Sequence, residues 1–160
     1  MATRPFYYEP PTTVSVSLEE QIESIITRDV HTIGPESPVI EAAGLMVKGG
    51  IDCLIVTSVK GAIGILTERD LLRKVTALGK NPSETLVKEV MSSPLISTSV
   101  FTTVGEAAKL MSDQGVRRLV VTGGDGDFIG IITMTDLVKW LASKEKLSES
   151  LMNYLTYEVF

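Results

Sequence analysis

A Thr and an Asp three residues apart occur twice in the chain, each time after a glycine and two aliphatic residues. The first copy is Gly64-Ile65-Leu66-Thr67-Glu68-Arg69-Asp70, and the second is Gly130-Ile131-Ile132-Thr133-Met134-Thr135-Asp136. An amphipathic stretch follows each copy, so we expect the Thr and Asp at a helix N-terminus. Free backbone N–H groups and the positive end of the helix dipole favour a phosphate there. The Asp carboxylate can accept two hydrogen bonds and suits the vicinal hydroxyls of a ribose.

Helix capping is a simpler interpretation of the same residues. Thr67 and Thr133 would be N-cap residues, and Asp70 and Asp136 would stabilise their own helix dipoles from the first turn. The two roles are compatible, and the presence of two copies favours ligand binding.

The residues near the two motifs differ in charge. Arg117 and Arg118 follow Gly115-Val116, and a guanidinium group can hold a phosphate with two hydrogen bonds. The alternative is an exposed pair on an edge strand. The matching first-copy residues are Asp52 and Cys53, so no cation lies there and Asp52 would repel a phosphate.

Arg69 in the first motif could partly supply the positive charge that the first copy lacks at Asp52 and Cys53. Its counterpart in the second motif is Thr135. We therefore expect two pockets of unequal affinity. Cys53 is expected to be a buried strand residue and not a reactive thiol.

The elements that position these residues are also repeated. The segment 39–46 matches 104–111, and 54–57 matches 119–122, with one residue inserted before the second motif. Apolar spacing predicts helices at 39–48, 68–78, 103–114 and 135–143, and short apolar runs predict paired strands before each motif. Ser17 and Glu20 fit a capping box for a helix reaching about Ile26.

Two small units therefore account for most of the chain. We expect an α/β (α+β) fold, in which each unit reads β-α-β-β-α and the two units pack sheet to sheet with pseudo-twofold symmetry, because so small a sheet leaves apolar surface open. The predicted boundaries are an extended N-terminal segment at 1–17, a first repeat at 18–79, a second repeat at 80–142 and a helical tail at 143–160.

This order of elements and motifs resembles a cystathionine β-synthase (CBS) domain, and the tandem pair over about residues 18–142 resembles a Bateman module. The resemblance implies a non-catalytic, stand-alone regulatory sensor that binds an adenine nucleotide (AMP, ADP or ATP) in the cleft between the repeats. It also implies that Arg117 and Arg118 can face phosphates, and that His31 and Ile96 lie near the adenine. S-adenosylmethionine is an alternative ligand, and a structural or interaction module with vestigial pockets is an alternative role. The candidate ligand-binding residues are Thr67, Arg69, Asp70, His31, Ile51, Asp52, Ile96, Val116, Arg117, Arg118, Thr133, Thr135 and Asp136.

Composition narrows the function classes. A net charge of −5 over 160 residues argues against general nucleic-acid binding. The single cysteine rules out an intramolecular disulfide and a cysteine-based zinc site, and no metal or further cofactor is expected. The sequence has no P-loop, no nucleophile elbow and no plausible Cys–His pair, so we expect no enzyme activity. There is no signal peptide and no apolar run of membrane-spanning length, so we expect a cytoplasmic protein.

We also expect a homodimer, with a further regulated protein as a possible partner. Apolar stripes on the helices are the expected interface, and the stretch 147–160 could swap onto the partner or cover an apolar edge. The apolar helix residues are Ala42, Met46, Leu71, Leu72, Ala107, Met111, Leu137 and Trp140.

Overall fold

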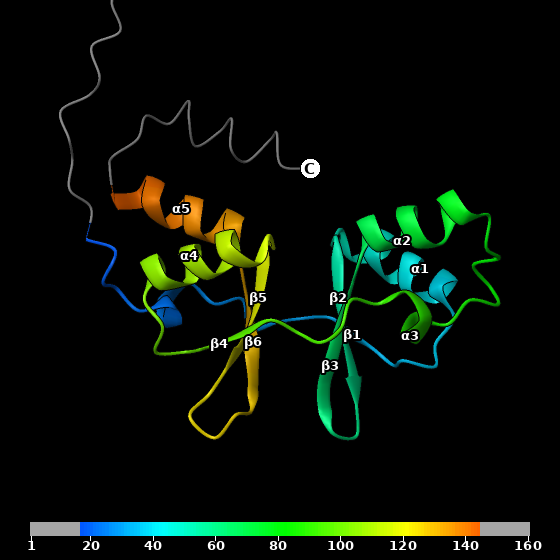
Figure 1. Ribbon diagram of the computed structural model, residues 1–160, viewed down its shortest axis with the longest axis horizontal. Coiled ribbons are helices and arrows are strands. Elements are labelled where there is room, and N and C mark those ends of the chain that lie inside the picture. The colour runs from blue at the N-terminus through cyan, green and yellow to red at the C-terminus, as the bar shows by residue number, and fades with distance from the viewer. Residues whose placement is uncertain (1–16, 145–160) are drawn as a thin grey trace, which may run out of the picture.

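The computed structural model describes residues 17–144, and its elements form two copies of one unit (Figure 1). The first copy contains β1 (Thr32–Ile33), α1 (Val39–Gly49), β2 (Cys53–Ser58), β3 (Gly61–Thr67), α2 (Glu68–Lys74) and the 3₁₀ helix η2 (Thr76–Leu78). The second copy contains β4 (Ser97–Ser99), α4 (Val104–Gln114), β5 (Arg118–Thr122), β6 (Phe128–Thr133) and α5 (Met134–Lys144). The short helices η1 (Ile22–Ile25) and α3 (Val87–Val90) precede the first strand of each copy. The predicted β-α-β-β-α order is confirmed in both copies.

Each copy forms one three-stranded sheet with the same pairing. β1 runs parallel to β2, and β2 runs antiparallel to β3; β4, β5 and β6 repeat this arrangement. The register places Cys53 opposite Thr67 and Arg118 opposite Thr133. The start of each central strand therefore lies beside the Thr of its own motif.

The two sheets face each other, with α1 and α2 outside one sheet and α4 and α5 outside the other (Figure 1). An apolar layer of Cys53, Ile55, Val120 and Ile131 lies between them. Burial of each such aliphatic side chain contributes about 1.5–3 kcal/mol, so this layer holds the copies together. The predicted sheet-to-sheet fold with pseudo-twofold symmetry is confirmed.

Apolar spacing explains the helices behind each sheet. In α1, Val39, Ala42 and Met46 are buried at intervals of three and four residues, which is the period of an amphipathic helix. The helix ends at Gly50, whose φ of 58° is left-handed and allows its N–H to bond back to the last turn. The same spacing and the same type of end recur in α4.

The chain segments before each first strand are exchanged between the copies. Ile22 lies in the core of the second copy and donates its backbone N–H to Thr102 at 2.9 Å. Conversely, Val87 and Val90 lie in the core of the first copy. Two connecting segments therefore cross between the copies, as Figure 1 shows, and each copy completes the core of the other.

The crossing segments explain the glycine that begins each motif. Thr27 pairs with Ile131, and Ser92 pairs with Ile65. A Cβ on Gly130 would collide with the carbonyl oxygen of Thr27, whereas a Cβ on Gly64 would meet Met91 Sδ at 2.6 Å. Glycine is required at Gly130 because another backbone segment passes directly over the strand. The restriction at Gly64 is weaker, because Met91 is flexible and the nearest backbone atom, Ser92 O, would lie 3.1 Å from the Cβ.

Two predicted helices differ from the structure, and a third difference concerns the expected dimer interface. The predicted helix from Ser17 is only the short η1, which begins after Gln21 without a side-chain cap. The helix predicted over 68–78 ends at Lys74 and continues as η2. The predicted stretch 147–160, like most of the N-terminal segment 1–17, lies outside the described residues.

The third difference concerns the helix residues expected at a dimer interface. Most of them are buried in the cores of the two copies, because their helices cover the sheets that they flank. Only Leu72 of that set is exposed, at 62%. The residues that are buried, and so not available for a dimer interface, are Ala42, Met46, Ala107, Met111, Leu137 and Trp140.

Candidate functional site

Both Thr-x-x-Asp motifs cap the helix that follows them. Asp70 N donates to Thr67 Oγ1 at 3.2 Å, and Asp70 Oδ2 accepts from Thr67 N at 3.0 Å and from its hydroxyl at 2.7 Å. Thr133 and Asp136 make the same three bonds at 3.2, 2.8 and 2.7 Å. The capping interpretation is confirmed, and it uses only one carboxylate oxygen of each Asp.

The second carboxylate oxygen of Asp70 is also occupied. Asp70 Oδ1 lies 2.7 Å from Lys74 Nζ and accepts from Ser92 Oγ at 3.1 Å. Burial opposes ionisation of Asp70, but the hydrogen bonds from Lys74 and Thr67 outweigh it and lower the pKa of this carboxyl below its usual value. Asp70 is buried and has no oxygen free for a ligand.

Lys74 is a key residue that sequence reasoning missed. Its ammonium group bonds Asp70, the carbonyl oxygen of Val90 at 2.7 Å and Ser92 Oγ at 3.3 Å. It therefore ties α2 to the segment that crosses to the second copy. The signal was available, since an Asp and a Lys four residues apart on a helix form an ion pair.

The second carboxylate oxygen of Asp136 is free within the described chain, 17–144. No side chain or backbone N–H there donates to Asp136 Oδ1, and Asp136 is half-buried. The residue in the position of Lys74 is Trp140, which is buried in the second core and brings no cation. The two motifs therefore differ: Asp136 offers an acceptor oxygen, and Asp70 does not.

An ion pair joins the two copies beside the motifs. Arg118 Nη2, at the start of β5, contacts the carboxylate of Asp52, the residue just before β2. The Arg118 side chain is 22% exposed and that of Asp52 is 59% exposed. Arg118 Nε is buried and has no acceptor among residues 17–144. Asp52 therefore opposes phosphate binding in a second way, because its carboxylate already contacts the guanidinium group that a phosphate would use.

Cys53 lies at the same junction and is buried in the layer between the sheets. Burial raises the pKa of its thiol to about 11, and Asp52 adds to this effect while Arg118 opposes it. A thiol with so high a pKa stays protonated at neutral pH and is a poor nucleophile. The prediction that Cys53 is a buried strand residue is confirmed.

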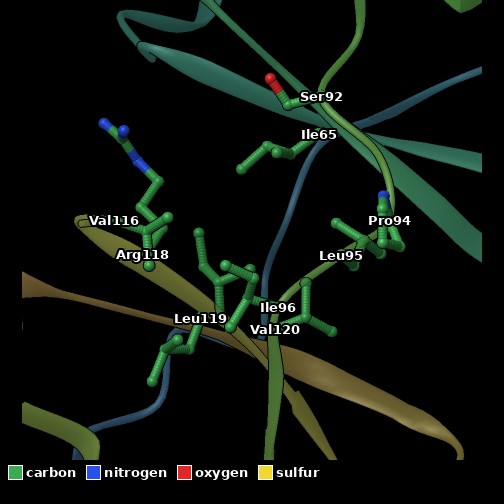
Figure 2. A pocket seen from close by; sticks show the side chains of 10 residues that line it. Ile65, Ser92, Pro94, Leu95, Ile96, Val116, Arg118, Leu119 and Val120 are labelled. Atoms are coloured by element: carbon green, nitrogen blue, oxygen red, sulfur yellow. The ribbon is translucent and has the colours of Figure 1, made fainter. Parts of the chain in front are cut away.

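A cavity lies next to Arg118, between the two sheets (Figure 2). Its volume is about 120 Å³, below the roughly 300–1,000 Å³ of pockets that enclose a whole ligand. It has room for one part of a nucleotide. Its walls are mostly apolar, and Figure 2 shows the guanidinium of Arg118 at the side away from Pro94 and Leu95. The lining residues are Ile65, Ser92, Pro94, Leu95, Ile96, Val116, Arg118, Leu119, Val120 and Ile131.

This cavity brings together part of the predicted set. Ile96, Val116 and Arg118 line it, and Thr133 is adjacent to Arg118 in the register of β5 and β6. Arg117 is exposed, and its carbonyl oxygen accepts from the N–H of Met134 at 2.9 Å. The N-terminus of α5 thus lies at the same end of the sheet as the two arginines.

The remaining first-copy residues lie outside this lining. His31 is exposed, and its carbonyl oxygen accepts from Ile55 N at 3.0 Å. Ile51 follows α1 and packs on the first core. Arg69 is exposed on α2, and Thr135, its counterpart, is half-buried on α5.

A second hollow lies between the hairpin turns of the two sheets, at Lys60–Ile63 and Gly126–Phe128, with a volume of about 410 Å³. None of the predicted site residues lines it. Within residues 17–144 there is no cluster of three His, Cys, Asp or Glu side chains fit to hold a metal. No helix of that region is long and apolar enough to cross a membrane.

Comparison with known proteins identifies relatives that share both copies. The family model described as CBS domain matches residues 22–77 and 87–143. A CBS domain-containing protein of Bacillus subtilis is 30% identical over 82% of this chain and 93% of its own length. An uncharacterized protein of Methanopyrus kandleri is 41% identical over 78% of this chain and 62% of its own length. An inosine-5'-monophosphate dehydrogenase of Korarchaeum cryptofilum is 35% identical over 76% of this chain but only 26% of the enzyme.

Solved structures share the same architecture. A protein with CBS domains from Burkholderia ambifaria superposes with a TM-score of 0.75 at 29% identity, over 81% of this chain and 99% of that one. A hexameric CBS-CP12 protein from bloom-forming cyanobacteria gives a TM-score of 0.69 at 31% identity, over 76% of this chain and 68% of that one.

Proposed function

Since this chain belongs to the CBS-domain family and carries two CBS domains in tandem, we propose that it is a non-catalytic regulatory module that binds one adenine nucleotide beside Asp136. The observation that carries the proposal is the Oδ1 of Asp136, which accepts no hydrogen bond within residues 17–144, in a motif whose Thr133 pairs with Arg118 at the edge of an apolar cavity. Such a site offers a separate contact to each part of a nucleotide.

The apolar cavity suits the base. Ile96, just before β4, lines it together with Val120 of β5 and Ile131 of β6, and these side chains leave room for a flat ring between the sheets. Asp136 accepts from the ribose hydroxyls, and Arg118 and the N-terminus of α5 face the phosphate. The two side chains that could most readily act as nucleophile or base are poorly suited to do so here, since burial raises the pKa of the Cys53 thiol to about 11 and His31 lies outside the cavity lining.

Relatives support a purine nucleotide as the ligand class. The chain aligns with part of inosine-5'-monophosphate dehydrogenases from Korarchaeum cryptofilum and Thermoplasma acidophilum, at 35% and 31% identity. These enzymes are named for a purine nucleotide, and the matched region is 26% and 22% of their length. A module shared with such enzymes fits a role in sensing nucleotides for a regulated protein.

S-adenosylmethionine is a second candidate, favoured by one observation. Arg118, the arginine that lines the cavity, is already paired with Asp52, so its charge is partly neutralised before a ligand binds. S-adenosylmethionine carries no phosphate, and its cationic sulfonium is compatible with Asp52. It would use the same cavity and the same Asp136.

A thermal-shift panel tests the proposal and separates the candidates. AMP, ADP, ATP, NAD, adenosine and S-adenosylmethionine are added to the full chain at up to millimolar concentration, with GTP and CTP as controls. A ligand at 100 times its Kd adds about 2.7 kcal/mol to the free energy of unfolding. An adenine nucleotide should raise Tm most. A shift with S-adenosylmethionine alone favours the second candidate, and no shift with any compound leaves a structural or interaction module.

The module is also a homodimer in this proposal. Apolar side chains on the outer faces of the helices are exposed: Val47 on α1 at 84%, Leu72 on α2 at 62% and Leu141 on α5 at 37%. Exposed apolar surface of this kind is typical of an interface. The hexameric CBS-CP12 relative supports self-association.

A further inference from the structure

The ion pair between Arg118 and Asp52 lies where the proposed nucleotide would place its phosphate. Arg118 lines the cavity, and Asp52 does not. The pair joins residues from different copies, since Asp52 precedes β2 and Arg118 begins β5. The protein therefore supplies its own carboxylate to the cation that a phosphate would use.

The two partners are not held equally. The Arg118 side chain is 22% exposed, whereas that of Asp52 is 59% exposed. Asp52 can therefore turn into water at small cost, while Arg118 stays beside the cavity. An ion pair with one partner open to solvent is weak, so a phosphate can displace this carboxylate.

Arg118 also has an unused donor. Its Nε is buried and without an acceptor among residues 17–144, and an unsatisfied buried donor is unfavourable. Asp52 contacts only the Nη2 side. A phosphate can accept from Nε and Nη2 together in the bidentate geometry that guanidinium groups favour.

We propose that Asp52 is an internal competitor for Arg118 that makes the pocket discriminate by ligand charge. This inference rests on the proposed function. A ligand with a strongly charged phosphate group displaces Asp52 and gains both Arg118 donors. A ligand without phosphate leaves the pair in place and binds only through its base and ribose. Displacement also breaks a contact between the two copies, so phosphate binding is coupled to their junction.

Titration of Asp52→Asn with ATP and adenosine tests this competition. The substitution removes the competing charge and keeps the side-chain shape. ATP should bind about two- to fivefold more tightly than to wild type, from the strength of an exposed pair, and adenosine affinity should not change. Glu36→Gln is the matched control, because it removes one charge from an exposed pair with Lys88 at the far end of α1.

A double substitution makes the test specific. In an Arg118→Met background, Asp52→Asn should no longer change ATP affinity, because the contested cation is gone. Equal ATP affinity of wild type and Asp52→Asn would overturn the competition but leave the proposed function standing. Tighter adenosine binding to the same extent as ATP would overturn it too. No binding of any adenine compound to either protein would overturn both proposals.

Discussion

Replacing each motif aspartate by alanine should separate a structural carboxylate from a ligand-binding one. Asp136→Ala removes the oxygen that accepts from the ribose hydroxyls, while Asp70→Ala removes an internal network. The two motifs are otherwise closely similar, since both Asp residues make the same capping bonds to the preceding Thr.

The magnitudes follow from the contacts. Hydrogen bonds to a charged group contribute about 1.5–3 kcal/mol each, so losing one ribose contact at Asp136 should weaken nucleotide binding about 10- to 150-fold. Asp70→Ala loses the bonds from Lys74 and Ser92 and leaves the Lys74 ammonium without its carboxylate. We expect a loss of about 2–4 kcal/mol in the free energy of unfolding, or roughly 5–15 °C in Tm, with nucleotide affinity within about threefold of wild type.

Calorimetric titration with AMP and ATP, together with thermal unfolding of the same samples, measures both effects. Asp113→Ala is the control, because Asp113 forms an exposed pair with Lys109 four residues away on α4 and should change neither quantity by more than about 0.5 kcal/mol. Equal losses of affinity in Asp70→Ala and Asp136→Ala would refute the assignment of Asp136 as the ribose acceptor.

Three further predictions concern stability and assembly. Gly130→Ala should destabilise the fold by about 3 kcal/mol, because its Cβ would collide with a backbone oxygen, whereas Gly44→Ala in open space on α1 should be neutral or stabilising in denaturant unfolding. Asp70→Asn should be less stable than wild type near pH 7, and the difference should shrink as pH falls below about 3.8, since the pKa of Asp70 is lowered from that value and its contribution is lost on protonation; a constant difference in urea unfolding from pH 7 to pH 3 would contradict this. Leu72→Glu should shift the molecular mass measured by light scattering toward the monomer, while Val59→Glu, on the β2–β3 turn, should not; a monomeric wild type at tens of micromolar would refute the dimer.

Much of the fold was predictable because it depends on local periodicity and on a repeat. The apolar spacing of 39–46 and 104–111 predicted α1 and α4. The two matching sets of elements predicted the pseudo-twofold symmetry. The exchange of η1 and α3 between the copies was not predictable in this way. It depends on which core a short apolar segment joins, and Ile22 or Val87 would suit either core.

The sequence predicted the residues of the two motifs but not the difference between their aspartates. The motif located both aspartates, but their difference comes from Lys74 and Ser92, which lie four and 22 residues beyond Asp70. The first could be inferred from helical spacing, and the second depends on the crossing segment. The pairing of Arg118 with Asp52 joins residues 66 apart and requires the packing of the two copies.

The stoichiometry of nucleotide binding, measured by calorimetric titration of the full chain with AMP, ADP and ATP, tests the central claim most directly. One nucleotide should bind per chain with a Kd in the micromolar range, about −8 kcal/mol, because only Asp136 has a free acceptor oxygen among the two motif aspartates. Two equivalent sites per chain, or no heat with any adenine nucleotide at millimolar concentration, would contradict it.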